Sequence, residues 1–205
     1  MRAARVALLA SLVVAIGAAS VSCTRDRVRG SGNVVARDIA VASFSRLEVG
    51  SAFEVTVSLG GQPSLTLRID DNLDRHVDVG VDGDTLHIGL RRGTSVSDVT
   101  LQAAVTAPSL AQIQGSGSSR IRLQDPLAGE DLRLELSGAS RLDLALEQLQ
   151  VDALEVGLSG ASNAEVWVRR TLSATLSGAS SLRYRGSPTL TRQETSGGSS
   201  ITRVS

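Results

Sequence analysis

Apolar and polar residues alternate along most of this chain, which predicts β-strands that each bury one face. The alternation is most regular between residues 112 and 204. In one stretch Leu132, Leu134 and Leu136 lead into a Ser-Gly turn, and Leu142 and Leu144 follow it. The next two stretches repeat this arrangement, so the chain contains an internal repeat.

A four-residue signature, Ser-Gly-x-Ser, marks each repeat and occurs five times. Its glycines are spaced 18 to 22 residues apart, at Gly117, Gly138, Gly160, Gly178 and Gly197. A period of about 20 residues is too short for helix-pair repeats and is near the length of a β-solenoid coil. The sequence therefore predicts an all-β fold, a parallel β-helix or solenoid of about 20-residue repeats.

The glycines are expected to form structural turns, because glycine tolerates the dihedral angles of a sharp bend. Counting from each glycine, the apolar positions fall at even offsets, which places the glycine and the second serine on the buried face. Stacking of the coils predicts a column of serine hydroxyls that bond between coils, at Ser119, Ser140, Ser162, Ser180 and Ser199. In the last copy Thr191, Gln193 and Thr195 replace apolar residues, as expected for a polar cap.

Residues 44–112 alternate less regularly and include Asp82-Gly83 between two strand patterns, a strong hairpin signal. We expect antiparallel pairing there, closing one end of the solenoid, with 91–98 as the most exposed loop. Residues 33–205 are predicted to form a single domain.

The first 22 residues have a positive start and an apolar run over 6–19, which is too short to span a bilayer and is typical of a secretory signal. The run ends at Cys23, the only cysteine in the chain, and this resembles a bacterial lipobox. We therefore expect a signal peptide over 1–22, lipid attachment at Cys23 and a tether over 23–32. An ordinary cut after Ala19 or Ser20 would instead leave a free thiol. The resemblance implies an outer-membrane lipoprotein, with the membrane face left open.

Charge and composition exclude several functions. The 21 basic residues are all Arg and are balanced by 21 acidic residues, which argues against nucleic-acid binding. The absence of Lys excludes a P-loop lysine and a Schiff base. No zinc spacing and no dinucleotide fingerprint occur, so no cofactor and no metal are predicted. The acidic segment 70–74 lacks EF-hand spacing and is expected to be a turn, with calcium binding as the alternative.

Three further sets of residues could carry chemistry. A serine hydrolase would need a nucleophilic serine beside His76 or His87, and the sequence contains no Gly-x-Ser-x-Gly elbow to supply it. No catalytic residue is therefore predicted. Two carboxylate pairs, Glu135 with Asp143 and Glu155 with Glu165, are expected to face outward on neighbouring strands, where they could hydrolyse a polysaccharide as general acid and as nucleophile or base. The alternative is that these carboxylates are ordinary charged residues on the solvent-exposed face of half-buried strands. Trp167 is also outward by parity and is a candidate sugar platform or partner contact.

Several motifs together resemble the bacterial family of auto-transporter adhesins with a head GIN domain. They are the lipoprotein-like start, followed by residues 30–33, 70–73, 82–83 and 106–110 and the Ser-Gly-x-Ser repeats. The resemblance implies a right-handed parallel β-helix without a catalytic set and a role in adhesion at the cell surface. Ala139, Ala161 and Ala179 depart from the family's frequent second glycine.

The function predicted from the sequence is a non-enzymatic, exported cell-envelope lipoprotein that presents a repetitive surface for adhesion or envelope interactions. A carbohydrate-binding or carbohydrate-active β-helix protein is the alternative. The expected partners are the membrane through the lipid anchor, and a surface polysaccharide or protein ligand. A homo-oligomer is compatible with the sequence, and no nucleic acid is expected.

Overall fold

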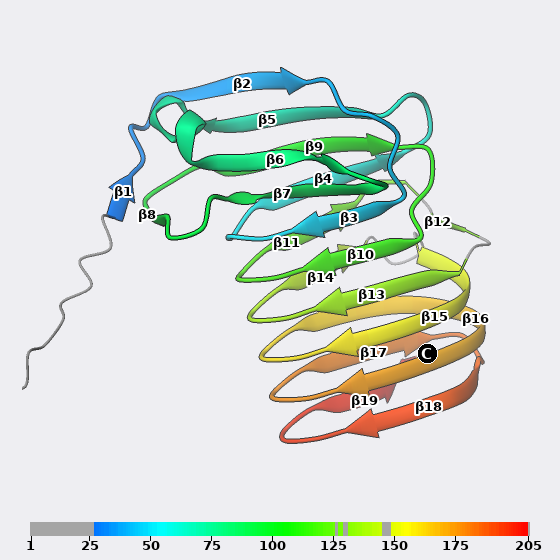
Figure 1. The fold of residues 1–205 in the computed structure, drawn as a ribbon. Coiled ribbons are helices and arrows are strands. Elements are labelled where there is room, and N and C mark those ends of the chain that lie inside the picture. Colours follow the sequence, from blue (N-terminus) through cyan, green and yellow to red (C-terminus); the bar gives the residue numbers. More distant parts are fainter. Residues whose placement is uncertain (1–26, 126, 129–130, 145–148, 205) are drawn as a thin grey trace, which may run out of the picture.

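The computed structural model describes residues 27–204 except 126, 129–130 and 145–148, so the predicted signal peptide and Cys23 lie outside the described residues. The described chain is all-β apart from one short 3-10 helix, and one large sheet contains 17 of its strands. Figure 1 shows this sheet folding back on itself in a stack of rungs. None of the described residues belongs to a helix long and apolar enough to cross a membrane.

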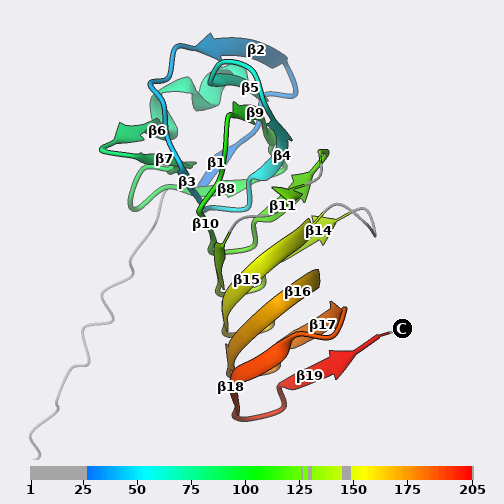
Figure 2. The ribbon, with the colours of Figure 1, turned by 90° about the vertical axis from the view of Figure 1, so that its right-hand side faces the viewer.

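Each rung contributes one strand to each of two faces, which we call the A face and the B face (Figure 2). The A face consists, in stacking order, of β7 (Thr85–Leu90), β3 (Arg46–Val49), β10 (Gln112–Gly115), β13 (Leu132–Leu136), the second half of β15 (Leu149–Leu158), the second half of β16 (Asn163–Leu176) and β18 (Thr189–Thr195). The B face consists of β9 (Leu101–Ala107), β4 (Glu54–Leu59), β11 (Arg120–Leu123), β14 (Arg141–Leu144), the first half of β16, β17 (Ser181–Arg185) and β19 (Ser200–Arg203).

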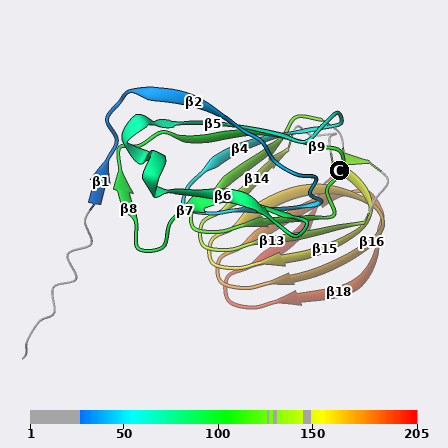
Figure 3. The ribbon, with the colours of Figure 1, turned by 45° about the horizontal axis from the view of Figure 1, so that its top comes forward.

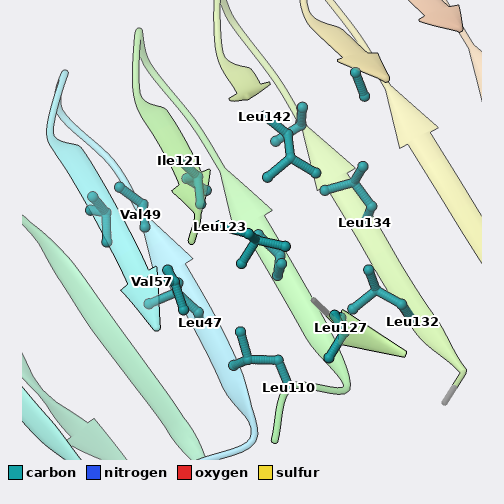
Figure 4. Packing of buried hydrophobic residues seen from close by; sticks show 14 of the residues in the cluster. Leu47, Val49, Val57, Leu110, Ile121, Leu123, Leu127, Leu132, Leu134 and Leu142 are labelled. Carbon is teal, nitrogen blue, oxygen red and sulfur yellow. The ribbon is translucent and has the colours of Figure 1, made fainter. Parts of the chain in front are cut away.

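All of these strand pairs are parallel, and their registers align the aliphatic residues in rows. On the A face one row joins Leu47, Ile113, Leu134, Val156 and Ala174. On the B face a second row joins Val55, Ile121, Leu142, Ala164 and Leu182. The two rows are buried and meet between the faces, where Figure 4 shows Leu134, Leu142, Ile121 and Leu123 close together. The core is thus a thin layer of aliphatic residues, as the alternation predicts.

The Ser-Gly-x-Ser segments connect the A face to the B face, and their glycines have φ between +69° and +75°. Successive turns are hydrogen-bonded to one another. The Ala161 amide donates to the Gly138 carbonyl at 2.7 Å, and the Ala179 amide donates to the Gly160 carbonyl at 2.7 Å. A Cβ atom at Gly138, Gly160 or Gly178 would collide with the carbonyl oxygen of the preceding turn's glycine.

Two details of the turns differ from the sequence prediction. The glycines of all five turns are exposed, because the turn carries the chain beyond the edge of both sheets, where no buried face exists. The second serines of the first four turns are buried as predicted, whereas Ser199 in the last turn is only half-buried. The serine hydroxyls mainly close their own turn: Ser162 donates to the Ser159 carbonyl at 2.8 Å. Only the contact between the Ser119 and Ser140 hydroxyls, at 3.2 Å, joins two serines of successive turns among the described residues.

An antiparallel cap covers the N-terminal end of the stack (Figure 3). In it β5 (Ser64–Asp70) pairs with both β2 (Val34–Ile39) and β9, and the 3-10 helix η1 (Asp71–His76) follows β5. The hairpin signal at Asp82-Gly83 is confirmed, since β6 (Val77–Asp82) pairs antiparallel with β7. The short strand β12 (Leu127–Ala128) pairs with β15 at the opposite edge from the turns.

The folded chain begins before residue 33. Strand β1 (Arg27–Arg29) pairs in parallel with β8 (Ser95–Ser97), so the last part of the predicted tether is ordered against the domain. The same pairing makes half of the predicted exposed loop 91–98 a half-buried strand.

The C-terminal end has no such cover. Every residue of β18 is exposed, and Gln193 and Thr195 lie in register below the buried Ala174 and Leu176. A register shift after Leu172 puts Leu190, not Thr191, opposite that residue, and Leu190 is 42% exposed. The polar cap is therefore made by Gln193 and Thr195.

Candidate functional site

The outer surface of the A face contains a groove of about 480 Å³, which we call groove A. Its centre is a row of residues in register, Glu48, Gln114, Glu135, Gly157 and Thr175. Gly157 has no side chain, and this leaves a hollow in the row. The Gln114 amide donates to the Glu135 carboxylate, and Glu48 has no ion pair or hydrogen bond within the described chain. Groove A therefore has an acidic floor.

A second groove, groove B, lies on the outer surface of the B face and has a volume of about 520 Å³. Strands β5, β9, β4 and β11 form it side by side. Ala104 lies at its centre and is flanked in register by Thr66 and Thr56. Three arginines line the same groove, namely Arg68, Arg120 and Arg122. Groove B is therefore basic, and hydroxyl groups line its centre.

The carboxylate pairs predicted from parity are not brought together. Glu155 lies on the A face and Glu165 on the B face, both with their side chains outward, so the core separates them. Glu135 and Asp143 are divided in the same way. Alternation distinguishes inward from outward residues, but it does not tell on which face a strand lies. These pairs cannot act together on one glycosidic bond, which requires two carboxylates flanking it.

Each of these carboxylates is also paired with arginine. Glu155 lies 3.4 Å from Arg133, and Glu165 lies 3.6 Å from both Arg183 and Arg185. Hydrogen bonding to Glu135 is the main cause that raises the pKa of the Arg133 guanidinium, with the charges of Glu135 and Glu155 adding to it. The outward charges thus form ion pairs along and across the rungs.

The histidines and Trp167 form no catalytic arrangement with these groups. His76 accepts a hydrogen bond from the Arg75 guanidinium at 3.1 Å, and the His87 imidazole lies 3.8 Å from Asp78. Trp167 is half-buried, and its ring lies against Gly186, where an added Cβ would be 3.1 Å from Trp167 Cδ1. Its role as a sugar or partner contact stays a prediction.

The acidic segment after β5 holds the N-terminal segment against the cap. Asp70 is 1% exposed, and its carboxylate accepts hydrogen bonds from the amides of Gly32 and Thr100 at 2.6 and 2.7 Å. The Asp71 carboxylate accepts hydrogen bonds from Ser31 Oγ at 2.6 Å and Asn33 Nδ2 at 2.8 Å. We call this set of contacts the Asp latch. No group of three or more His, Cys, Asp or Glu suited to a metal ion occurs among the described residues.

The contacts that Asp71 contributes to the Asp latch should weaken in acid. The hydrogen bond from Ser31, followed by the one from Asn33, holds the pKa of Asp71 below its ordinary value of 3.8. Because this pKa is depressed in the folded state, its stabilising effect is present above pH 3.8 and is lost as the pH falls through the lower folded-state value. We expect Asp71→Ala to lower the melting temperature at about pH 6 and the difference from wild type to shrink at about pH 3. A difference that is constant between these pH values would contradict this role for the Asp71 charge.

Sequence reasoning missed groove B. Its residues come from four strands whose order in space does not follow their order in the chain, so their meeting depends on the antiparallel insertion of β5 beside β9. Two features of the sequence could have indicated it. Outward positions in 54–68 carry hydroxyl groups and an arginine, and the small Ala104 occupies an outward position on β9. The same reasoning missed the contact between residues 31–33 and 70–72, although both segments were noted separately.

Comparisons with known proteins agree on the fold. A profile of the family described as "Putative auto-transporter adhesin, head GIN domain" matches residues 43–153 and 143–188. The crystal structure of a "putative adhesin" from Bacteroides fragilis NCTC 9343 is similar over 86% of this chain and 100% of that chain, with 16% identity and a TM-score of 0.59. A "putative adhesin" from Parabacteroides distasonis ATCC 8503 is similar over 87% and 100%, with 18% identity and a TM-score of 0.52. No curated protein matches the chain.

Proposed function

We propose that this chain, which belongs to the "Putative auto-transporter adhesin, head GIN domain" family, is a non-enzymatic cell-envelope protein that displays a repetitive surface for adhesion. The family and its structural relatives suggest an adhesin-like protein at the cell surface or in the envelope.

The observation that carries the proposal is the in-register arrangement of outward residues. One row on the A face runs through Arg46, Gln112, Arg133, Glu155 and Ser173, one residue per rung. We infer that the rungs form a parallel β-solenoid of about 20-residue repeats, in which polar groups recur at roughly 4.8 Å. Such a rigid, periodic surface suits contact with an extended or repetitive partner.

The proposal of a non-enzymatic role rests on the outward carboxylates. The two carboxylate pairs considered from the sequence are divided between the two faces and paired with arginine, which argues against their use as the acid and base of a β-helix glycosidase. A binding protein does not need an acid and base pair, since ion-paired and hydroxyl groups can contact a ligand without proton transfer.

Lipid attachment at Cys23 would orient the molecule. Strand β1, which begins at Arg27, lies beside the N-terminal cap (Figure 1), and the four residue steps from Cys23 to Arg27 span at most about 14 Å when fully extended. The anchor would therefore keep the cap close to the membrane and leave the β18 and β19 end pointing away from it. The anchored orientation exposes both outer faces along the length of the stack.

One experiment tests anchoring and adhesion together. The full chain and its Cys23→Ser variant are expressed in a Gram-negative host, and the cells are fractionated and tested for adhesion to immobilised matrix proteins and polysaccharides. We expect wild type in the membrane fraction with saturable adhesion, and Cys23→Ser in the soluble fraction with adhesion lost. Membrane retention of the variant would refute lipidation, and absence of saturable adhesion by wild-type cells would refute the adhesive role.

A carbohydrate-binding role is the second candidate, and groove B supports it. Its lining contains hydroxyl, amide and guanidinium groups, which can form hydrogen bonds with sugar hydroxyls.

A further inference from the structure

We propose that groove B binds an acidic glycan, with Arg68 and Arg122 contacting its anionic groups and the polar side chains between them contacting its hydroxyl groups. This inference rests on the proposed adhesive function and assigns it a site and a ligand class.

Among the described arginines on strands β2 to β19, Arg68 and Arg122 differ from the rest in having no partner. From β2 to β19, the other strand arginines of the described chain form ion pairs or hydrogen bonds, including Arg120, which lies 3.0 Å from Glu54 and 3.3 Å from Asp143. Arg68 and Arg122 have neither an ion pair nor a hydrogen bond within the described residues, yet both line the same groove. Their guanidinium donors are therefore available to a ligand, and such donors match the geometry of a carboxylate or sulfate.

The acidic residues around the groove are already engaged. Glu54 pairs with Arg120, Asp143 pairs with Arg120 and Arg141, and Asp38 accepts a hydrogen bond from Thr66 at 2.7 Å. The Thr66 hydroxyl leaves the charge of Asp38 in place, but the groove lining itself has a positive excess, because it contains three arginines and a single carboxylate, Glu54. Groove A, where Glu48 is unpaired, has the opposite character and would repel an acidic ligand.

The floor between the two arginines suits a sugar. The outward residue at its centre, Ala104, projects only a methyl group, while Thr56, Thr66 and Gln102 surround it in neighbouring register positions. Hydroxyl and amide side chains both donate and accept hydrogen bonds, as sugar hydroxyls do. The small side chain leaves room for a ring above the sheet.

The spacing of the arginines favours an oligomer over a single anion. Arg68 is on β5 and Arg122 on β11, with β9 and β4 between them. Three strand spacings of roughly 4.8 Å across the sheet and an offset of two residues along it place their backbones about 16 Å apart. Each guanidinium group can then contact a different anionic group. A glycan with a charged group on successive sugars would supply one such group to each arginine.

The test measures binding by isothermal titration calorimetry with the purified exported protein. The probes are trigalacturonate, the uncharged maltotriose, and inorganic phosphate, each in low and high salt. Arg68→Gln/Arg122→Gln is the test variant. Arg92→Gln is the matched control, because Arg92 is also exposed and unpaired but lies in the loop between β7 and β8, outside the groove.

We expect trigalacturonate to bind at least tenfold more tightly than either maltotriose or phosphate and to weaken in high salt. The double variant should weaken trigalacturonate binding at least tenfold, and Arg92→Gln should leave it unchanged. Phosphate binding as tight as trigalacturonate binding would show a simple anion site and overturn the glycan assignment. Equal binding of maltotriose, no acidic-probe binding, or an unaffected double variant would also overturn it. If cells still adhere while any of these results is found, the inference fails and the proposed function stands.

Discussion

Replacing Gly160 by Ala is expected to destabilise the protein by about 2 to 4 kcal/mol, through two separate effects. The first is backbone strain, because Gly160 has φ of +73°, a conformation that costs an L-residue roughly 1 to 2 kcal/mol. The second is a collision, because the new Cβ would meet the Gly138 carbonyl oxygen. That oxygen accepts a hydrogen bond from the Ala161 amide at 2.7 Å, so the two turns cannot separate without losing it.

Substitutions at two other glycines distinguish the backbone strain from the collision. Gly83 has φ of +61°, but an added Cβ would lie in open space, so Gly83→Ala should cost only about 1 kcal/mol. Gly157 lies outside the left-handed region, and its Cβ would be in ordinary contact, 3.9 Å from Glu135 Cγ. Gly157→Ala should therefore change stability by less than about 0.5 kcal/mol. Urea denaturation of the three variants measures the differences. Equal costs at Gly160 and Gly83 would show that the stacking of the turns adds nothing.

The repeat made much of the fold predictable, because alternation identifies buried residues without knowledge of the neighbours. Leu134, Leu136 and Leu142 were assigned to the core from parity alone and are buried. The hairpin at Asp82-Gly83 followed from local turn chemistry. In these cases the information lies within a few residues of the feature that it predicts.

The features that escaped prediction depend on contacts between distant segments. Whether Glu155 and Glu165 share a face depends on how the chain turns between strands, and parity does not record that. The pairing of β1 with β8 joins segments almost 70 residues apart in the chain, and neither is a regular alternating run. Groove B needs both the parallel stack and the antiparallel cap, so no single repeat contains it.

Replacing Asp70 by Asn should destabilise the protein by about 2 to 3 kcal/mol, although the two side chains are almost the same size. Both carboxylate oxygens accept a backbone hydrogen bond, one from Gly32 and one from Thr100. An amide offers one oxygen, so its NH₂ group must face one of these N–H donors. The site is 1% exposed, and water therefore cannot readily supply a replacement acceptor.

Because Gly32 belongs to the segment that follows β1, the loss should be local as well as global: β1 should detach from β8 before the stack unfolds. Limited proteolysis should then cut Asp70→Asn within residues 27–33 under conditions that leave the wild type intact. Asp82→Asn is the matched control, since Asp82 is exposed and Asn-Gly suits the hairpin turn as well as Asp-Gly does. If Asp70→Asn were as stable and as resistant to protease as Asp82→Asn, the buried carboxylate would not be what fastens the N-terminal segment. In that case the pairing of β1 with β8 and the hydrogen bonds of Asp71 and Asn72 to residues 29–33 would hold it without Asp70.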